Sequence, residues 1–244
     1  MYSGTYKFAD IPVEIKSVYE EVHKLCRDYI SDENPCFSIE TNQTDIVFER
    51  KKSESNDKKD GLPIRNFMDS YLETLAVYRK IANNFLDRNI ILFHGSVVAV
   101  DKTGYLFTAK SGTGKSTHTK LWREYFGERA FMVNDDKPLI KINEENVTVY
   151  GTPWNGKHNL SQNTSVPLKA VCILKRSEKN HIEKITKSEA YPMLIQQVHR
   201  PCDAAKMVNL LKLIDKFARN INFYKLGCNM EIEAAEIAYN EMKG

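Results

Sequence analysis

A glycine-rich segment between an apolar run and a helix start is the feature of this sequence that most restricts its fold. Tyr105, Leu106 and Phe107 predict a buried strand, and Ser111–Thr117 then has the sequence Ser-Gly-Thr-Gly-Lys-Ser-Thr. This order is typical of phosphate-binding loops, in which backbone N–H groups and a helix N-terminus face the phosphates. The usual pattern has glycine where this chain has Ala109, a change that costs little unless the residue needs a positive φ. The sequence therefore predicts a nucleotide site.

Each residue of this loop has an expected role. Lys115 is expected to reach the β- and γ-phosphates, and the Ser116 hydroxyl to ligate Mg²⁺. The remaining residues expected to contact the nucleotide are Ser111, Gly112, Thr113, Gly114 and Thr117.

A pair of carboxylates follows the next apolar run. Residues 130–134 predict a short strand that leads directly into Asp135 and Asp136. In open α/β sheets ligands bind at the carboxyl ends of strands. The residues after residues 105–107 and after residues 130–134 would therefore lie at the same edge of the sheet. Asp-Asp-Lys-Pro is also good turn chemistry, so a solvated turn is the alternative. Beside a phosphate-binding loop, we expect metal binding or base chemistry here.

These segments together resemble the catalytic domain of HPr kinase/phosphorylase over residues 90–175. The ordered set is a His-Gly pair at His94, the strand after Gly104, the glycine-rich loop and the double Asp. The loop also looks like that of phosphoenolpyruvate carboxykinase, a structural relative of that family. The resemblance implies an α/β fold: a P-loop core with a mixed sheet flanked by helices, plus a small α+β N-terminal region.

The resemblance also implies roles for individual residues. Asp135 would be the base toward a protein serine with His94 beside it, and Asp136 and Ser116 would hold metal. Lys115 would complete the catalytic set. Thr117 stands where HPr kinases usually carry Glu, which weakens the case for their full metal arrangement and for phosphorylase activity.

Composition excludes several classes of protein. Lys plus Arg (35) nearly balance Asp plus Glu (32), so no strongly basic face for nucleic acid is implied. The five cysteines show no C-x-x-C spacing, which fits a reducing cytosol. No signal peptide or membrane-spanning run is evident, so we expect a cytoplasmic protein without a membrane partner. The sequence leaves homo-oligomer formation open.

The chain is expected to have two parts. Residues 51–63 are dominated by Ser, Asn, Asp, Lys and Gly, which favours a linker. We therefore expect a small N-terminal α+β region over residues 1–62 and the catalytic domain over residues 63–244. An amphipathic helix is expected over residues 15–30.

Three residues are candidates for substrate binding. The segment Gly151–Asn159 has two glycines, a proline, Trp154 and Lys157, which is elaborate for a plain connection. Arg200 lies in a helix-ending turn, residues 199–201, and could reach phosphate, although an ordinary surface arginine is the alternative.

The preferred hypothesis is an ATP- and Mg²⁺-dependent kinase that transfers the γ-phosphate to Ser or Thr of a peptide or small protein. A phosphoenolpyruvate carboxykinase-like enzyme or a kinase for free serine or another small molecule is the second hypothesis. A nucleotide-sensing module without turnover is the third, and the retention of Lys115, Ser116 and both Asp residues disfavours it.

Overall fold

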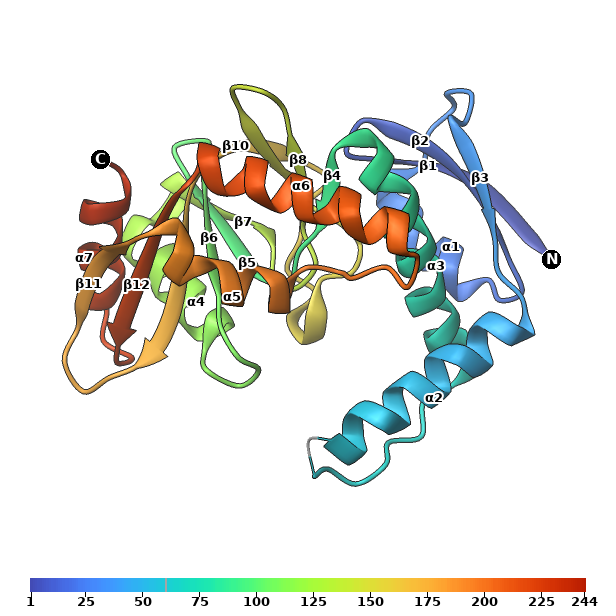
Figure 1. Cartoon of the computed structure of the whole chain (residues 1–244), viewed down its shortest axis with the longest axis horizontal. Helices are drawn as coiled ribbons and strands as arrows, with labels where there is room; N and C mark the ends of the chain where they lie inside the picture. The colour runs from blue at the N-terminus through green and yellow to red at the C-terminus, as the bar shows by residue number, and fades with distance from the viewer. Residues whose placement is uncertain (60) are drawn as a thin grey trace. The chain divides into compact units, whose positions relative to one another are not determined.

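The computed structural model describes residues 1–59 and 61–244, which form two compact units, Met1–Asn84 and Phe85–Gly244 (Figure 1). The boundary expected after residue 62 lies inside the first unit. Among the described helices, none combines the length and apolar character that a bilayer crossing requires.

The first unit holds a three-stranded sheet and three helices. Its elements are β1 (Tyr2–Phe8), β2 (Ile11–Ser17), α1 (Glu21–Cys26), a 3₁₀ turn η1 (Arg27–Tyr29), β3 (Phe37–Glu40), α2 (Gln43–Lys59) and α3 (Asp69–Phe85). The strand order is β1-β2-β3, with β1 antiparallel and β3 parallel to β2.

A buried carboxylate ties α3 to this unit. Glu73 is fully buried and accepts hydrogen bonds from the N–H groups of Val18 (2.7 Å) and Tyr19 (2.8 Å). It also accepts one from Thr41 Oγ1 (2.6 Å). A buried carboxylate without such donors would be very costly, so α3 groups with the N-terminal elements and not with the core that follows.

Two local expectations differ from the structure of this unit. Most of the expected linker lies in α2, where buried Glu49 and Asp57 pair with Arg79 and Arg65. These ion pairs do not produce the apolar periodicity by which a helix is recognised. The helix expected from residue 15 begins only at Glu21, because β2 extends to Ser17.

The second unit is an α/β structure with a mixed, curled sheet of nine strands flanked by helices, which confirms the expected fold class at that level. Its strands are β4 (Ile90–Leu92), β5 (Ser96–Val100), β6 (Thr103–Thr108), β7 (Ala130–Asn134), β8 (Leu139–Ile142), β9 (Val147–Tyr150), β10 (Ser165–Arg176), β11 (His181–Ile185) and β12 (Asn222–Cys228). Its helices are α4 (Lys115–Phe126), α5 (Lys187–Gln197), α6 (Ala204–Asn220) and α7 (Glu233–Met242), with 3₁₀ turns η2 (Leu86–Arg88), η3 (Gly127–Arg129) and η4 (Gly156–His158). The strand path is β4-β8-β9-β10-β6-β5-β7, with β12 beside β10 and β11 beside β12.

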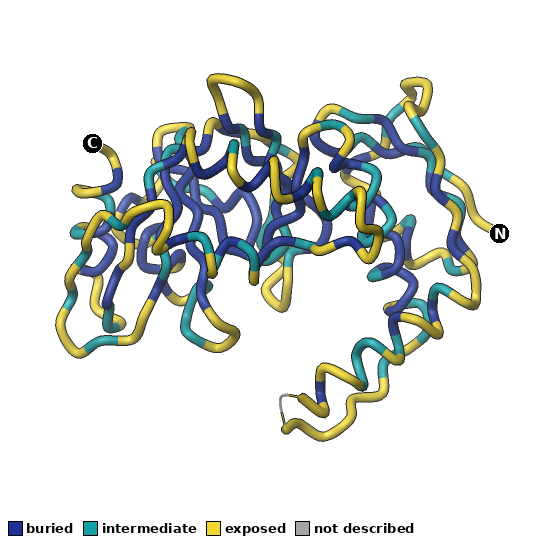
Figure 2. Tube along the Cα trace, in the orientation of Figure 1, coloured by how far each residue is buried: buried dark blue, intermediate teal, exposed yellow. Residues whose placement is uncertain are grey.

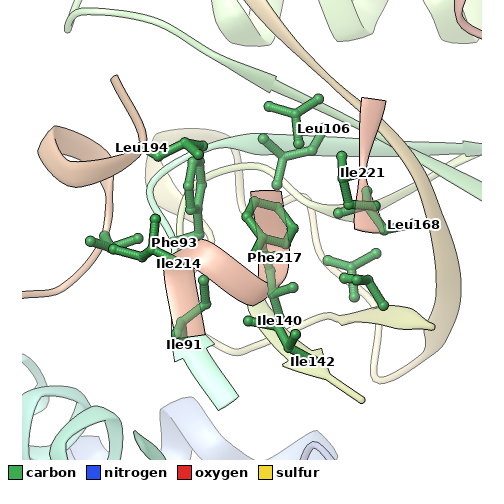
Figure 3. Close-up of a cluster of buried hydrophobic side chains, with 14 of the residues drawn as sticks. Ile91, Phe93, Leu106, Ile140, Ile142, Leu168, Leu194, Ile214, Phe217 and Ile221 are labelled. Atoms are coloured by element: carbon green, nitrogen blue, oxygen red, sulfur yellow. The ribbon is translucent and has the colours of Figure 1, made fainter. Parts of the chain in front are cut away.

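Helices cover both faces of this sheet because its strands are apolar on both sides. In β5, Val97 and Ala99 belong to the core under α5 and α6, whereas Val98 and Val100 belong to the core under α4 and α7. Figure 3 shows the first core, to which Phe217 and Ile214 of α6 and Leu106 of β6 belong. The tube in Figure 2 is buried along these strands and exposed at most of the loops.

The strand register brings three loops to one edge of the sheet. β5 runs antiparallel to both neighbours, pairing Ser96 with Phe107 of β6 and Val97 with Asn134 of β7. β10 runs parallel to β6, pairing Ile173 with Thr108. The loop before β5, the glycine-rich loop after β6, the residues after β7 and the end of β10 therefore meet.

Candidate functional site

The glycine-rich loop lies between β6 and α4, as the sequence predicts. Gly112 and Gly114 have φ values of +75° and +120°, which other residues rarely adopt. A Cβ atom at either position would meet no atom within 4 Å, so space beside the backbone is open to a ligand. Ala109 is fully buried and is not among the residues with positive φ, so alanine is compatible with the loop there.

Lys115 and Ser116 open α4 directly after this loop, with Gly114 as the N-cap residue. Burial lowers the pKa of Lys115, and its neighbour Lys137 adds to that shift, whereas Asp136 and Asp135 oppose it. The ammonium group is therefore partly desolvated, and the charges of both carboxylates act on it. Ser116 is partly buried, whereas Ser111 and Thr117 are exposed.

Arg176 holds the outside of the loop, a contact that the sequence analysis missed. Its Nη2 donates to the carbonyl of Gly112 (2.6 Å) and its Nε to that of Thr113 (3.4 Å). β10 is parallel to β6 and longer, so its last residue lies beside the loop that follows β6. No signal in the sequence could identify Arg176 without knowledge of this strand pairing.

Asp135 is buried, with 5% of its surface exposed, and faces the first turns of α4. Ser96 Oγ donates a 2.6 Å hydrogen bond to its Oδ1, and the Thr119 hydroxyl lies 3.2 Å from Ser96 Oγ. Thr119 in turn bonds the carbonyl of Ser116 (3.3 Å). This chain of contacts connects Asp135 with the helix turn that carries Ser116.

Asp136 is the carboxylate that pairs with His94, at 3.2 Å between Nε2 and Oδ1. The expectation placed His94 beside Asp135, whereas its ion pair in the structure is with Asp136. The backbone explains the change: the N–H of Gly95 donates to the carbonyl of Asp136 (3.0 Å), which aligns the loop before β5 with that residue. Lys137 Nζ also contacts Asp136, at 3.0 and 3.1 Å.

These contacts set the charge states of the pair. Burial raises the pKa of Asp136, but the hydrogen bond from His94 and the charge of Lys137 outweigh it and lower the value to about 2. Burial lowers the pKa of His94, and the positive charges of Lys137 and Lys115 add to that effect. At neutral pH the site therefore holds an ionised Asp136 beside a neutral imidazole.

Asn134 fixes the turn that presents both carboxylates. Its Oδ1 accepts from the N–H groups of Asp136 (2.9 Å) and Lys137 (2.7 Å), and its Nδ2 donates to the carbonyl of Thr152 (2.9 Å). Asparagine at a strand end commonly forms such turns, so the Asn-Asp-Asp run carries a signal that the sequence analysis did not use.

The segment Gly151–Asn159 passes along the same carboxylate. A Cβ on Gly156 would lie 3.2 Å from Asp136 Cβ, and exposed Lys157 is the next residue. Trp154 is 8% exposed, and its carbonyl accepts from the N–H of Lys137 (3.2 Å). Trp154, a candidate for substrate binding, is therefore largely buried.

Arg200 follows a segment that lines the other side of His94. The N–H of His94 donates to the carbonyl of Gln197 (2.7 Å), and the N–H of His199 donates to that of Leu92 (2.9 Å). Arg200 comes next along the chain and is exposed, and the described contacts do not join it to the loop or to either carboxylate.

The donor set fits a nucleotide-bound Mg²⁺ better than a cation caged by protein alone. Among the described residues no cluster of three His, Cys, Asp or Glu side chains could hold a metal. Mg²⁺ in nucleotide sites takes one or two carboxylates, a hydroxyl, waters and phosphate oxygens. Ser116 and Asp135, joined through Thr119 and Ser96, offer that hydroxyl and carboxylate.

Comparisons with known proteins give one family match. The family model described as "ScmC: SynChlorMet cassette protein ScmC" matches residues 63–233. No curated protein matches the chain. A solved structure of the Hpr(Ser) kinase/phosphatase from Coxiella burnetii aligns with 14% identity, 63% coverage of this chain, 99% coverage of that chain and a TM-score of 0.33. A likeness at this level carries no argument about activity.

Proposed function

The chain belongs to the SynChlorMet cassette protein ScmC family, and we propose that it is an ATP- and Mg²⁺-dependent phosphotransferase whose acceptor is a hydroxyl of a peptide or small protein. The observation that carries this proposal is the convergence of a glycine-rich helix N-terminus and an ionised, histidine-paired carboxylate on one sheet edge. Phosphoryl transfer needs those two parts in one place: donors that hold the phosphates and a group that accepts the hydroxyl proton.

The loop side of the site binds the nucleotide in this proposal. The N–H groups of residues 111–117 and the α4 dipole face the phosphates, and Lys115 pairs with the β- and γ-phosphates. Ser116 and Asp135 would hold Mg²⁺, which when bound would supply positive charge beside the transferred group. Partial desolvation of Lys115 strengthens its attraction to phosphate, because fewer waters compete.

The opposite side of the site accepts the proton. The acceptor oxygen attacks the γ-phosphorus, the bond to the β–γ bridging oxygen breaks, and the hydroxyl proton passes to Asp136. His94 orients Asp136 through their 3.2 Å contact, and Asn134 fixes its backbone. This exchanges the roles that the resemblance implied for Asp135 and Asp136.

A polypeptide acceptor is supported by the exposure of residues 156–159 beside Asp136. A site for a free amino acid would enclose its small ligand, and residues 156–159 would then be buried around it and not exposed. Lys157 is positioned to contact the acceptor or its phosphate in this proposal.

The test is transfer of label from γ-labelled ATP and Mg²⁺ to a degenerate library of serine- and threonine-containing peptides, with free serine as the competing acceptor. We expect label in the peptides and little in free serine. Efficient labelling of free serine, without labelling of the peptides, would show that the acceptor is a small alcohol and not a polypeptide. Mg²⁺-dependent ATP binding without transfer to either acceptor would favour a nucleotide sensor and overturn the proposal.

A further inference from the structure

We propose that the acceptor polypeptide binds as an added strand along the outer edge of β7, with one of its acidic side chains paired to Arg123. This inference rests on the proposed function, because it describes how that reaction would receive its second substrate.

The outer edge of β7 is only partly paired. On one side β7 is antiparallel to β5. On the other, Asn134 bridges to Ser161 and the Gln162 N–H donates to the Val133 carbonyl (3.2 Å), both at the end of the strand. Within the described chain, no strand pairs with the outer edge of residues 130–132. Such an edge presents backbone donors and acceptors that an extended peptide can pair with.

A cavity of about 290 Å³ lies against this edge. Phe131 and Met132 line it from β7, Arg123 from α4, and Asn159 and Gln162 from the segment that continues the Asp136 loop. A larger cavity of about 510 Å³ between α5 and α6 is lined by neither β7 nor the residues of the candidate site. The smaller cavity reaches Asn159, the last residue of the segment whose Gly156 lies against Asp136.

Arg123 gives this cavity its charge preference. Its Nε is buried and has no hydrogen-bond partner among the described residues. The ion pairs of the described chain do not include its guanidinium group, whereas neighbouring Arg129 pairs with Asp101 (2.5 Å). Arg123 lines the cavity, and a guanidinium donates charge-assisted hydrogen bonds to a carboxylate. The edge therefore favours an acidic peptide over a basic one.

The spacing along β7 predicts where the acidic residue lies. Met132 precedes Asp136, the proposed proton acceptor, by four residues, which is about 13 Å along an extended strand. Residues 161 and 162 already bond this edge at Asn134 and Val133, so the added strand would pair with residues 130–132 and cross that segment on its way to Asp136. At the rise of an extended strand, its acidic residue would be about three to five positions from the acceptor hydroxyl.

The first experiment measures binding to the full chain by fluorescence anisotropy, so that it does not depend on turnover. The probes are labelled peptides with a central serine and one Asp or one Lys at each flanking position. We expect Asp at the predicted distance to bind about tenfold more tightly than Lys. Arg123→Glu should reverse that preference and Arg123→Lys should keep its direction.

Lys120→Glu is the matched control, because Lys120 is an exposed residue of the same helix. It should keep the acidic preference, and unchanged ATP affinity in every variant shows that the fold is intact. Equal binding of Asp and Lys peptides, or an acidic preference that survives Arg123→Glu, would overturn the inference.

The second experiment tests the strand geometry by N-methylating the peptide one amide at a time. Alternate amides of an added strand point to the sheet, so alternate methylations should each weaken binding about tenfold and the intervening ones should not. Uniform effects would contradict a strand. A preference for Asp peptides together with alternating N-methylation effects, but without phosphotransfer, would support this mode of binding and contradict the proposed function. Phosphotransfer without these two binding results would support the proposed function and contradict this mode of binding.

Discussion

His94 Nε2 lies 3.2 Å from Asp136 Oδ1, so Asp136 has a different environment from the adjacent Asp135. Asp136 faces an imidazole and an ammonium group, whereas Asp135 is buried against the Ser96 hydroxyl. Two neighbouring residues of one type thus acquire different chemistry from their surroundings. In the proposed reaction this difference separates the proton acceptor from the metal ligand.

Lys115→Ala should weaken ATP·Mg²⁺ binding by about 100-fold or more, because it removes the cation nearest the phosphates while leaving the loop glycines in place. Isothermal titration calorimetry measures the change, and Lys120→Ala, on the exposed side of α4, should keep wild-type affinity. Wild-type affinity in Lys115→Ala would show that the nucleotide does not bind at this loop.

Arg176→Met should raise the KM for ATP about 10- to 150-fold while kcat changes little. Its two hydrogen bonds position the Gly112 and Thr113 carbonyls and do not touch the reacting atoms, and a charged hydrogen bond contributes about 1.5–3 kcal/mol. Steady-state kinetics gives the split, and Lys175→Met, at the adjacent exposed position, is the control. Partial recovery in Arg176→Lys is expected, whereas an equal loss of kcat would contradict a positioning role.

Strands β6 and β7 and helix α4 were predictable because the sequence patterns that indicate them are local. The apolar run of β6, the glycines and the start of α4 follow each other along the chain, as do β7 and its two carboxylates. The first unit was harder to predict. Helix α2 depends on ion pairs such as Arg79 with Glu49, and these link residues that are distant in sequence.

The contacts of the candidate site were less predictable than its residues. His94 and both Asp residues could be named from the ordered motif, but the pairing of His94 with Asp136 depends on how the loop before β5 meets the turn after β7. Arg176 and Arg123 come near the site through strand order and helix packing, which no local pattern encodes.

His118 should make the folded state sensitive to acid. It is 2% exposed, its Nε2 accepts a hydrogen bond from Trp122 Nε1 (3.0 Å), and burial lowers its pKa to about 3. The unfolded chain binds a proton at this residue below about pH 6.5, whereas the folded chain does not until about pH 3. Stability from this group is therefore complete above about pH 6.5 and falls as the pH decreases toward 3.

His118→Gln keeps an acceptor for Trp122 but cannot titrate, so its urea midpoint should fall less between pH 7.5 and pH 5 than that of the wild type. His158→Gln changes an exposed histidine and should follow the wild type. An identical pH dependence in His118→Gln would show that His118 does not contribute.

The central claim is that Asp136 acts in the transfer step and not in nucleotide binding. The most direct measurement is single-turnover transfer of γ-label to the serine-containing peptide library by Asp136→Asn at saturating ATP·Mg²⁺, beside its ATP affinity from calorimetry. The account predicts an affinity within about threefold of wild type and a transfer rate lower by 10²–10⁴-fold, the usual contribution of a general base. Asp135→Asn should instead lose Mg²⁺-dependent affinity. Transfer at the wild-type rate in Asp136→Asn, or an equal loss of ATP affinity, would contradict the account.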